Sequence, residues 1–390
     1  MITKLRLAIR NDLEAPAEQR TSGSGWLSGV GALVASLAGL FLLLSWQYPG
    51  VFSMQALAVI HQKTYFSGLI QAFLVLGFLL ACFNLILRRN KILGFSAIAV
   101  VFLATTLGET ARVSLPSNAA TTIGLDWFTI NILLTGILFI PLEKIFGRLT
   151  EQPLFRQEWR EDLFYFLLSS LLVQGLTYLS LSPSMLILQH TGNWSEFRQM
   201  VTSQPLLLQV IEIMFLTDFA QYWFHRAFHQ IPFLWGFHAV HHSAQKMDWL
   251  AGSRMHIVEI VGLRGLTIIP MYVLGFAESA LHAYILLVYL NATFVHADVR
   301  FNLEWLKPFI VTPRFQHWHH EVEKEAIDVN FAIHFPLFDR LFGTYYMPKN
   351  AWPSAYGIGG HPVPNGYLKQ FAYPFRRKIH YVTNITFRDQ

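Results

Sequence analysis

Long apolar runs alternate with short polar segments over most of the chain. Each run has about the length that a helix needs to cross a bilayer, roughly 20 residues. The pattern predicts an all-α, polytopic membrane helical bundle with spans at roughly 26–46, 66–87, 92–109, 127–142, 163–181, 206–224, 257–276 and 280–296. A turn around Gly275 joins the last two runs, which form either two full spans or a re-entrant hairpin.

The composition supports a membrane protein. Only 14% of the residues are charged and 53% are hydrophobic, whereas soluble domains carry about 25% charged residues. The basic residues are scattered between the apolar runs, so the net charge of +5 does not indicate a nucleic-acid partner. Cys82 is the only cysteine, which excludes a disulfide framework and a thiolate metal site.

Basic residues between the runs predict the orientation. With the N-terminus in the cytoplasm, the inside loops hold eleven of them: Lys4, Arg6, Arg10, Arg20, Arg88, Arg89, Lys91, Lys144, Arg148, Arg156 and Arg160. The outside loops hold three: Lys63, Arg112 and Arg198. This excess favours the orientation and puts the run ends at His225 and His296 on the cytoplasmic face. The chain finishes TFRDQ, which is not an ER-retrieval sequence, so we expect a bacterial inner membrane rather than the ER.

The topology divides the chain into four predicted parts. Residues 1–24 are a cytoplasmic N-terminal segment, and 25–204 hold the N-terminal transmembrane spans. Residues 205–348 form a histidine-rich catalytic region with a transmembrane hairpin, and this region supplies a cytoplasmic metal-binding cap. Residues 349–390 form a cytoplasmic C-terminal tail.

Histidines gather on the predicted cytoplasmic side. The clusters are HRAFH at 225–229, HAVHH at 238–242 and HWHH at 317–320, and FVHAD contains the isolated His296. Histidines three or four residues apart share one face of a helix. Neutral imidazole is the commonest protein ligand for transition metals. One tetrahedral zinc needs only four ligands, so eight or nine histidines at one membrane face predict a site for two metal ions.

The other seven histidines are weaker candidates. His282 lies 14 residues before His296, about 21 Å away along a helix, and is excluded because it falls towards the opposite membrane face. Four histidines without a cluster are expected in loops or at the surface: His61, His190, His361 and His380. His256 and His334 lie on the predicted cytoplasmic side but are isolated. They are minor candidates for contacts with the metal ligands or for a substrate pocket.

Two other classes of membrane protein also use histidine ligands. A metal-ion transporter places its ligands near the middle of the bilayer, often on broken helices. A haem-type electron-transfer protein needs axial histidines on facing spans. The clusters in this chain lie at run ends and beyond, which favours an enzyme and leaves the transporter and the haem protein as alternatives.

The histidine clusters resemble the fatty acid hydroxylase / sterol desaturase superfamily of integral-membrane di-iron enzymes. Its order of HxxxH, HxxHH, a lone histidine and a final HxxHH is found over about 205–348, where DVNFAIHFPLFDRLFGTYY follows the last box. The resemblance implies eight metal ligands: His225, His229, His238, His241, His242, His296, His319 and His320. In register the final box begins with Gln316, so the neighbouring His317 is a candidate ninth ligand.

The resemblance also implies the cofactor and the partners. Two Fe ions would form a di-iron centre, with O2 as cosubstrate. The substrate would be a lipid such as a sterol or fatty acyl chain, whose unactivated C–H bond is hydroxylated or desaturated, and we favour hydroxylation. The chain has no GxGxxG motif after a strand and no cysteine set for an iron–sulfur cluster. We therefore expect a separate electron donor, a ferredoxin or a small haem protein with its reductase.

Asp218 is the predicted catalytic-site carboxylate. It lies seven residues before His225, two turns earlier on the same helix face. A carboxylate in an apolar helix is costly unless it has a role, so we predict that it orients a metal-binding imidazole. Three further acids follow histidines and are either outer partners or solvated loop residues: Asp298, Glu321 and Asp328. Arg254 is either an interface anchor or a ligand for an anionic lipid headgroup.

Overall fold

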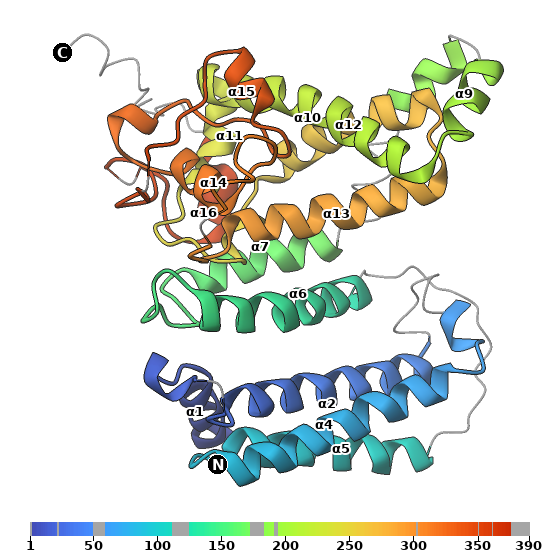
Figure 1. Cartoon of the computed structure of the whole chain (residues 1–390), viewed down its shortest axis with the longest axis vertical. Helices are drawn as coiled ribbons and strands as arrows, with labels where there is room; N and C mark the ends of the chain where they lie inside the picture. The colour runs from blue at the N-terminus through green and yellow to red at the C-terminus, as the bar shows by residue number, and fades with distance from the viewer. Residues whose placement is uncertain are drawn as a thin grey trace. The chain divides into compact units, whose positions relative to one another are not determined.

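In the computed structural model, the regular elements of the described part of the chain are helices, and loops join them (Figure 1). The described residues are 2–21, 23–49, 59–110, 125–171, 183–190, 194–301, 303–349, 351–360 and 362–375. Among them, extended pairing is limited to an isolated bridge between Glu321 and Tyr356. The predicted all-α class is confirmed. The chain forms two compact units, Met1–Arg156 and Gln157–Gln390.

The first unit is built on close packing between long apolar helices. Its helices are α1 (Ile2–Leu13), α2 (Trp26–Gln47), α4 (Phe66–Leu87), α5 (Ile92–Thr110) and α6 (Leu125–Phe146). Helix α2 packs against both α4 and α5 through Ala32, Ala81 and Ala97, which are buried. Gly77 of α4 lies so close to Ser36 of α2 that a Cβ atom would come within 2.8 Å of the Ser36 backbone nitrogen. Small residues permit this close approach of two backbones.

The second unit contains all the histidine clusters. Its helices are α7 (Trp159–Leu171), α9 (Ser195–Thr202), α10 (Leu206–Gln230), α11 (Pro232–His242), α12 (Ile257–Leu274), α13 (Glu278–His296), α14 (Pro313–His319), α15 (Leu337–Leu341) and α16 (Tyr367–Ala372). Helices α10, α12 and α13 pack together around Ile213, Met271 and Tyr284. Within this unit, α9 lies at one end of the three helices, and α11 and α14 lie at the other (Figure 1).

Four described helices are long and apolar enough to cross a membrane, namely α2, α4, α12 and α13. The predicted spans at 26–46, 66–87, 257–276 and 280–296 are therefore confirmed as helices of membrane length. Helices α9 and α10 pass the same test as a pair, but they are bent by 114° at the break between them. The apolar part of α5, Ile92–Gly108, is shorter.

The two remaining predicted runs fall on α6 and α7. The 127–142 run lies within α6, and the 163–181 run is helical to Leu171 and then passes outside the described residues. The predicted boundary at 204/205 falls between α9 and α10, within the second unit.

Candidate metal centre

A sharp turn after α10 brings the first two histidine clusters together. His225 and His229 lie near the end of α10, one turn apart on the same face. Ile231 is extended, as residues before proline prefer, and Pro232 begins α11, where its missing N–H is not needed. Helix α11 therefore turns back, and Nε2 of His225 lies 3.0 Å from Nε2 of His238.

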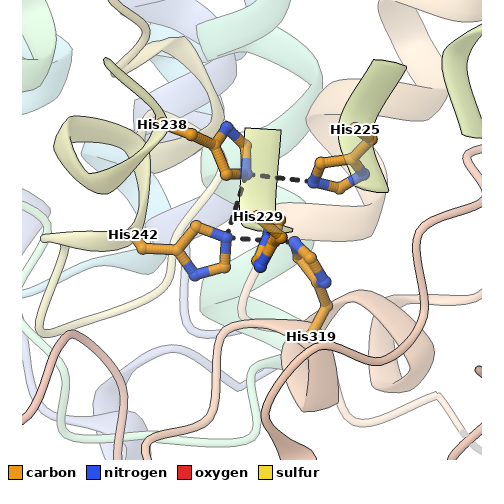
Figure 2. Close-up of side chains that lie close together, drawn as sticks. All are labelled: His225, His229, His238, His242 and His319. Atoms are coloured by element: carbon orange, nitrogen blue, oxygen red, sulfur yellow. Dashed lines mark hydrogen bonds between the residues drawn. The ribbon is translucent and has the colours of Figure 1, made fainter. Parts of the chain in front are cut away.

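Five histidines converge on one point, and we call them group one. They are His225, His229, His238, His242 and His319, and a ring nitrogen of each lies within 4.8 Å of those of the others. Figure 2 shows Nε2 of His242 close to its neighbours, 3.1 Å from Nε2 of His238 and 3.0 Å from Nε2 of His319. His319 comes from α14, so the last cluster in the sequence joins the first two.

Three more histidines form group two beside group one. They are His241, His296 and His320, and their ring nitrogens also lie within 4.8 Å of one another. Nε2 of His296, the last residue of α13, lies 3.4 Å from Nε2 of His241. The rings of His320 and His242 stack with their centroids 4.4 Å apart, which places the two groups side by side. The structure thus brings together all eight histidines that the sequence analysis named as ligands.

The outward-facing Nδ1 atoms of three rings in group one contact protein acceptors. Nδ1 of His225 and Nδ1 of His319 donate to backbone carbonyls in the 329–335 loop, at 2.9 and 2.7 Å. Nδ1 of His238 donates to Oε1 of Glu259 at 2.5 Å, and both side chains are buried. A neutral imidazole that donates from Nδ1 has a lone pair on Nε2. These contacts therefore aim the Nε2 lone pairs at the centre of group one.

The geometry of group one fits a metal ion. The Nε2 atoms of His225 and His238 both carry lone pairs, so at 3.0 Å neither can donate a hydrogen bond to the other. A cation bound between them would replace this repulsion with attraction. Two nitrogens that bind one ion at right angles, each about 2.1 Å from it, are about 3.0 Å apart. The separations in group one match this spacing.

Burial keeps the rings in the form that binds metal. It lowers the pKa of His238, His241 and His242 well below the usual value, and the neighbouring rings add to the effect. The pKa values of His319 and His320 are lowered well below the usual value for the same reason. Because only the neutral ring has a free lone pair, burial favours the ligand form.

Asp218 acts on the centre through the backbone. Its carboxylate accepts two N–H groups of the 329–335 loop, from Ile333 at 2.8 Å and from Phe335 at 2.6 Å. Asp339 accepts two other N–H groups of the same loop, at 2.7 and 2.9 Å. The sequence analysis predicted an imidazole as the partner of Asp218, but the structure places its carboxylate on the loop whose carbonyls hold two of the rings. We therefore predict that Asp218 positions this loop and does not contact a metal-binding ring directly.

His317 lies outside both groups. Its Nδ1 is 2.7 Å from the hydroxyl of Tyr356, and its Nε2 donates to the carbonyl of Ala297 at 3.1 Å. Among the three further acids, Asp328 contacts a ring of group one, with Oδ1 3.2 Å from Nδ1 of His229. The two isolated histidines that were minor candidates also lie outside both groups: His256 and His334.

Arg254 is buried and forms ion pairs with two carboxylates. Its Nε donates to Oδ1 of Asp162 at 2.6 Å, and Nη1 lies 3.3 Å from Oε1 of Glu158. Its carbonyl accepts Nδ1 of His241 at 3.0 Å. The sequence alone did not indicate this contact of the Arg254 carbonyl, or the contact of Glu259 with His238. A backbone carbonyl is common to all residue types, and Glu259 lies 17 residues after the second histidine cluster ends.

We expect Gln in place of Glu259 to weaken metal retention by about 10–100-fold. The amide oxygen can still accept from His238, but the negative charge that strengthens Nε2 as a ligand is lost. The measurement is the metal content of the purified protein across a series of chelator concentrations. Glu278→Gln changes a carboxylate that is 86% exposed on α13 and serves as the control. Equal retention in the two variants would contradict the role given to Glu259.

The apolar helices and the two histidine groups define a membrane-type helical protein with a buried histidine cluster that could hold metal. Residues 210–344 match the family model for fatty acid hydroxylase. This range includes both histidine groups, Asp218 and Glu259. Residues 210–344 therefore form a domain of the fatty acid hydroxylase / sterol desaturase superfamily, which is the family that the histidine boxes predicted.

The chain is similar to several lipid-modifying enzymes. It is 30% identical over 177 residues to an ornithine lipid hydroxylase of Rhizobium tropici, which covers 45% of this chain and 52% of the relative. It is 28% identical to human alkylglycerol monooxygenase over 37% of this chain and 32% of the relative. A putative methylsterol monooxygenase of Dictyostelium discoideum is 26% identical over 53% of this chain and 77% of the relative. No solved structure matches the chain. The chain thus spans about half of the first relative and about a third of the second.

Proposed function

We propose that this chain is an integral-membrane, oxygen-dependent lipid hydroxylase whose eight converging histidines hold two iron ions. The observation that carries this proposal is the inward arrangement of the Nε2 atoms in group one, with separations of 3.0, 3.1 and 3.0 Å. The names of the relatives support it, since they are a hydroxylase and monooxygenases that act on lipids. The proposed substrate class is a lipid such as a sterol or a fatty acyl chain.

Iron at such a centre supplies the reductive activation of O2 needed to insert an oxygen atom into an unactivated C–H bond. For hydroxylation, the substrate R–H, O2, two electrons and two protons give R–OH and water. The chain's own residues hold neutral ligands in fixed orientations and exclude water from the rings. We assign the electrons to a separate donor, a ferredoxin or a small haem protein with its reductase.

The position of the centre suits a substrate that arrives from lipid. His225 lies near the end of α10 and His296 is the last residue of α13, so both groups lie at one end of the apolar helices. One face of α10 presents Phe215, Phe219 and Trp223, which are 45%, 45% and 43% exposed. These side chains could contact an acyl or sterol body, and they lie on a different face of α10 from His225, which follows Trp223 by two residues and therefore by about 200° around the helix. The distribution of basic residues supports a cytoplasmic position for the centre.

A metal transporter or a haem-type electron-transfer protein is less well supported. A transporter would hold its ligands near the middle of the spans, whereas the two groups lie at helix ends and on α11 and α14. Axial ligation of a haem needs two opposed rings, whereas group one holds five rings around a single point. The family match and the named relatives favour the hydroxylase.

Labelled oxygen tests the proposed function. The full-length protein is expressed in a bacterial host lacking this gene, under isotopically labelled O2, and membrane lipids are compared with those of cells without the protein. We expect a lipid that carries one labelled oxygen atom; loss of two hydrogens without label would indicate desaturation. A purified protein with one zinc per chain as its sole metal, combined with unchanged lipids, would contradict the proposal.

A further inference from the structure

Gln316 occupies a position in group two that the histidine pattern reserves for an imidazole. It lies on α14, one turn before His320, and its side chain is buried. Its amide nitrogen lies 3.4 Å from Nε2 of His296 and 3.3 Å from Nε2 of His320. The side chain therefore points at the centre of group two with the two rings.

Three separations between side-chain nitrogens in group two are slightly longer than the three given for group one. Four donors arranged tetrahedrally, each about 2.1 Å from one ion, are about 3.4 Å apart. The separation between His241 and His296 is 3.4 Å, and those from Gln316 are 3.4 and 3.3 Å. These three separations match the distance between neighbouring positions around a single tetrahedral ion.

We propose that Gln316 fills the fourth coordination position of group two and makes it the weaker of the two metal positions. The inference rests on the proposed function, because it requires that both groups bind metal. It adds that the two groups differ in metal affinity and that Gln316 causes the difference.

Two features of group two explain the weaker binding. A carbonyl oxygen is a poorer ligand than imidazole for late first-row metal ions. The amide must also choose between two uses, because a half-turn of its end group exchanges Nε2 and Oε1. With nitrogen inward it donates to Nε2 of His296, whose own Nδ1 donates to the Ala292 carbonyl at 2.6 Å. Metal binding must replace that hydrogen bond.

The ring of His320 adds to the difference between the groups. In the described part of the chain its Nδ1 is buried without a hydrogen-bond partner. By contrast, Nδ1 of His238 in group one donates to the Glu259 carboxylate. A partner at Nδ1 orients a metal-binding imidazole and raises its basicity. His320 lacks this support, so both it and Gln316 make group two the weaker position.

Chelator competition on the full-length protein in detergent tests the proposal. The protein is loaded anaerobically with Fe²⁺ alone, dialysed against increasing chelator, and analysed for metal per chain. We expect wild type to lose its two ions in separate steps, at chelator concentrations at least about tenfold apart. Gln316→His should move the weaker step towards the stronger one. Gln316→Leu should lose the weaker step and keep the stronger. Gln245→Leu changes an exposed glutamine and should behave as wild type.

The chelator results test the role of Gln316 separately from the presence of a metal centre. If wild type loses two ions in a single step and Gln316→Leu still retains two, the inference is wrong while the metal centre stands. If Gln316→Leu does not fold, Gln316→His decides, and a pair of steps unchanged from wild type in that variant overturns the inference. A wild-type protein that binds no iron overturns the proposed function and this inference with it.

Discussion

Replacing His319 with alanine is expected to lower oxygen-dependent lipid turnover by more than about 100-fold and to remove one metal ion per chain. The ring of His319 is oriented by Nδ1, which donates to the Val329 carbonyl at 2.7 Å, and its Nε2 lies 3.0 Å from Nε2 of His242. Alanine leaves an opening in group one that no described neighbour can fill with a nitrogen ligand. The measurements are labelled-oxygen incorporation and metal content of the purified variant.

His282→Ala is the matched control for this experiment. His282 lies on α13, near the end opposite to His296, and its side chain is 71% exposed. We expect this variant to keep wild-type turnover and metal content. Both variants should retain the helix content of wild type by circular dichroism, because the long helices α10, α12 and α13 pack together through other residues. A His319→Ala protein with both metal ions and half of the wild-type turnover would contradict the assignment of group one.

Helical periodicity made much of the centre predictable from sequence. It places His225 and His229 on one face of α10, and the span ends predict that this face meets the other clusters. The residues that hold the rings were not predictable in the same way. Glu259 reaches His238 because α12 packs against α11 as well as against α10. That contact depends on tertiary packing, which spacing along the chain does not encode.

The contrast between Gln316 and His317 shows a further limit of sequence analysis. Both were considered for the same ligand position, because they are adjacent and lie in the final box. Adjacent residues of a helix point about 100° apart, so the two cannot both fill one ligand position. The structure turns Gln316 towards group two and His317 towards the hydroxyl of Tyr356. The helix phase of α14 decides between them, and it is set by packing beyond the motif.

Asp218 illustrates the difference between predicting a role and predicting a partner. Its burial in an apolar helix correctly indicated that the carboxylate must be satisfied within the protein. The partners proved to be the backbone N–H groups of Ile333 and Phe335. Backbone donors are the same for every residue type, so the sequence carries no mark of which loop would supply them.

Removing metal with a chelator is expected to lower the Tm of the protein by about 5–10 °C for each ion lost. An ion at about 100 times its Kd stabilises the folded state by about 2.7 kcal/mol. For a domain of about 150–250 residues, each kcal/mol shifts Tm by about 2–4 °C. The measurement is thermal unfolding of the detergent-solubilised protein, followed by fluorescence, before chelation, after chelation and after Fe²⁺ is restored.

The physical reason for this loss is the set of lone pairs that group one directs at one point. In a buried site water cannot screen their repulsion, and burial opposes protonation of His238 and His242, which would otherwise relieve it. His319→Ala should therefore show a smaller Tm change on chelation, because it has one ion fewer to lose. The same Tm with and without chelator in wild type, at full metal removal, would show that the rings need no cation and would contradict the metal centre itself.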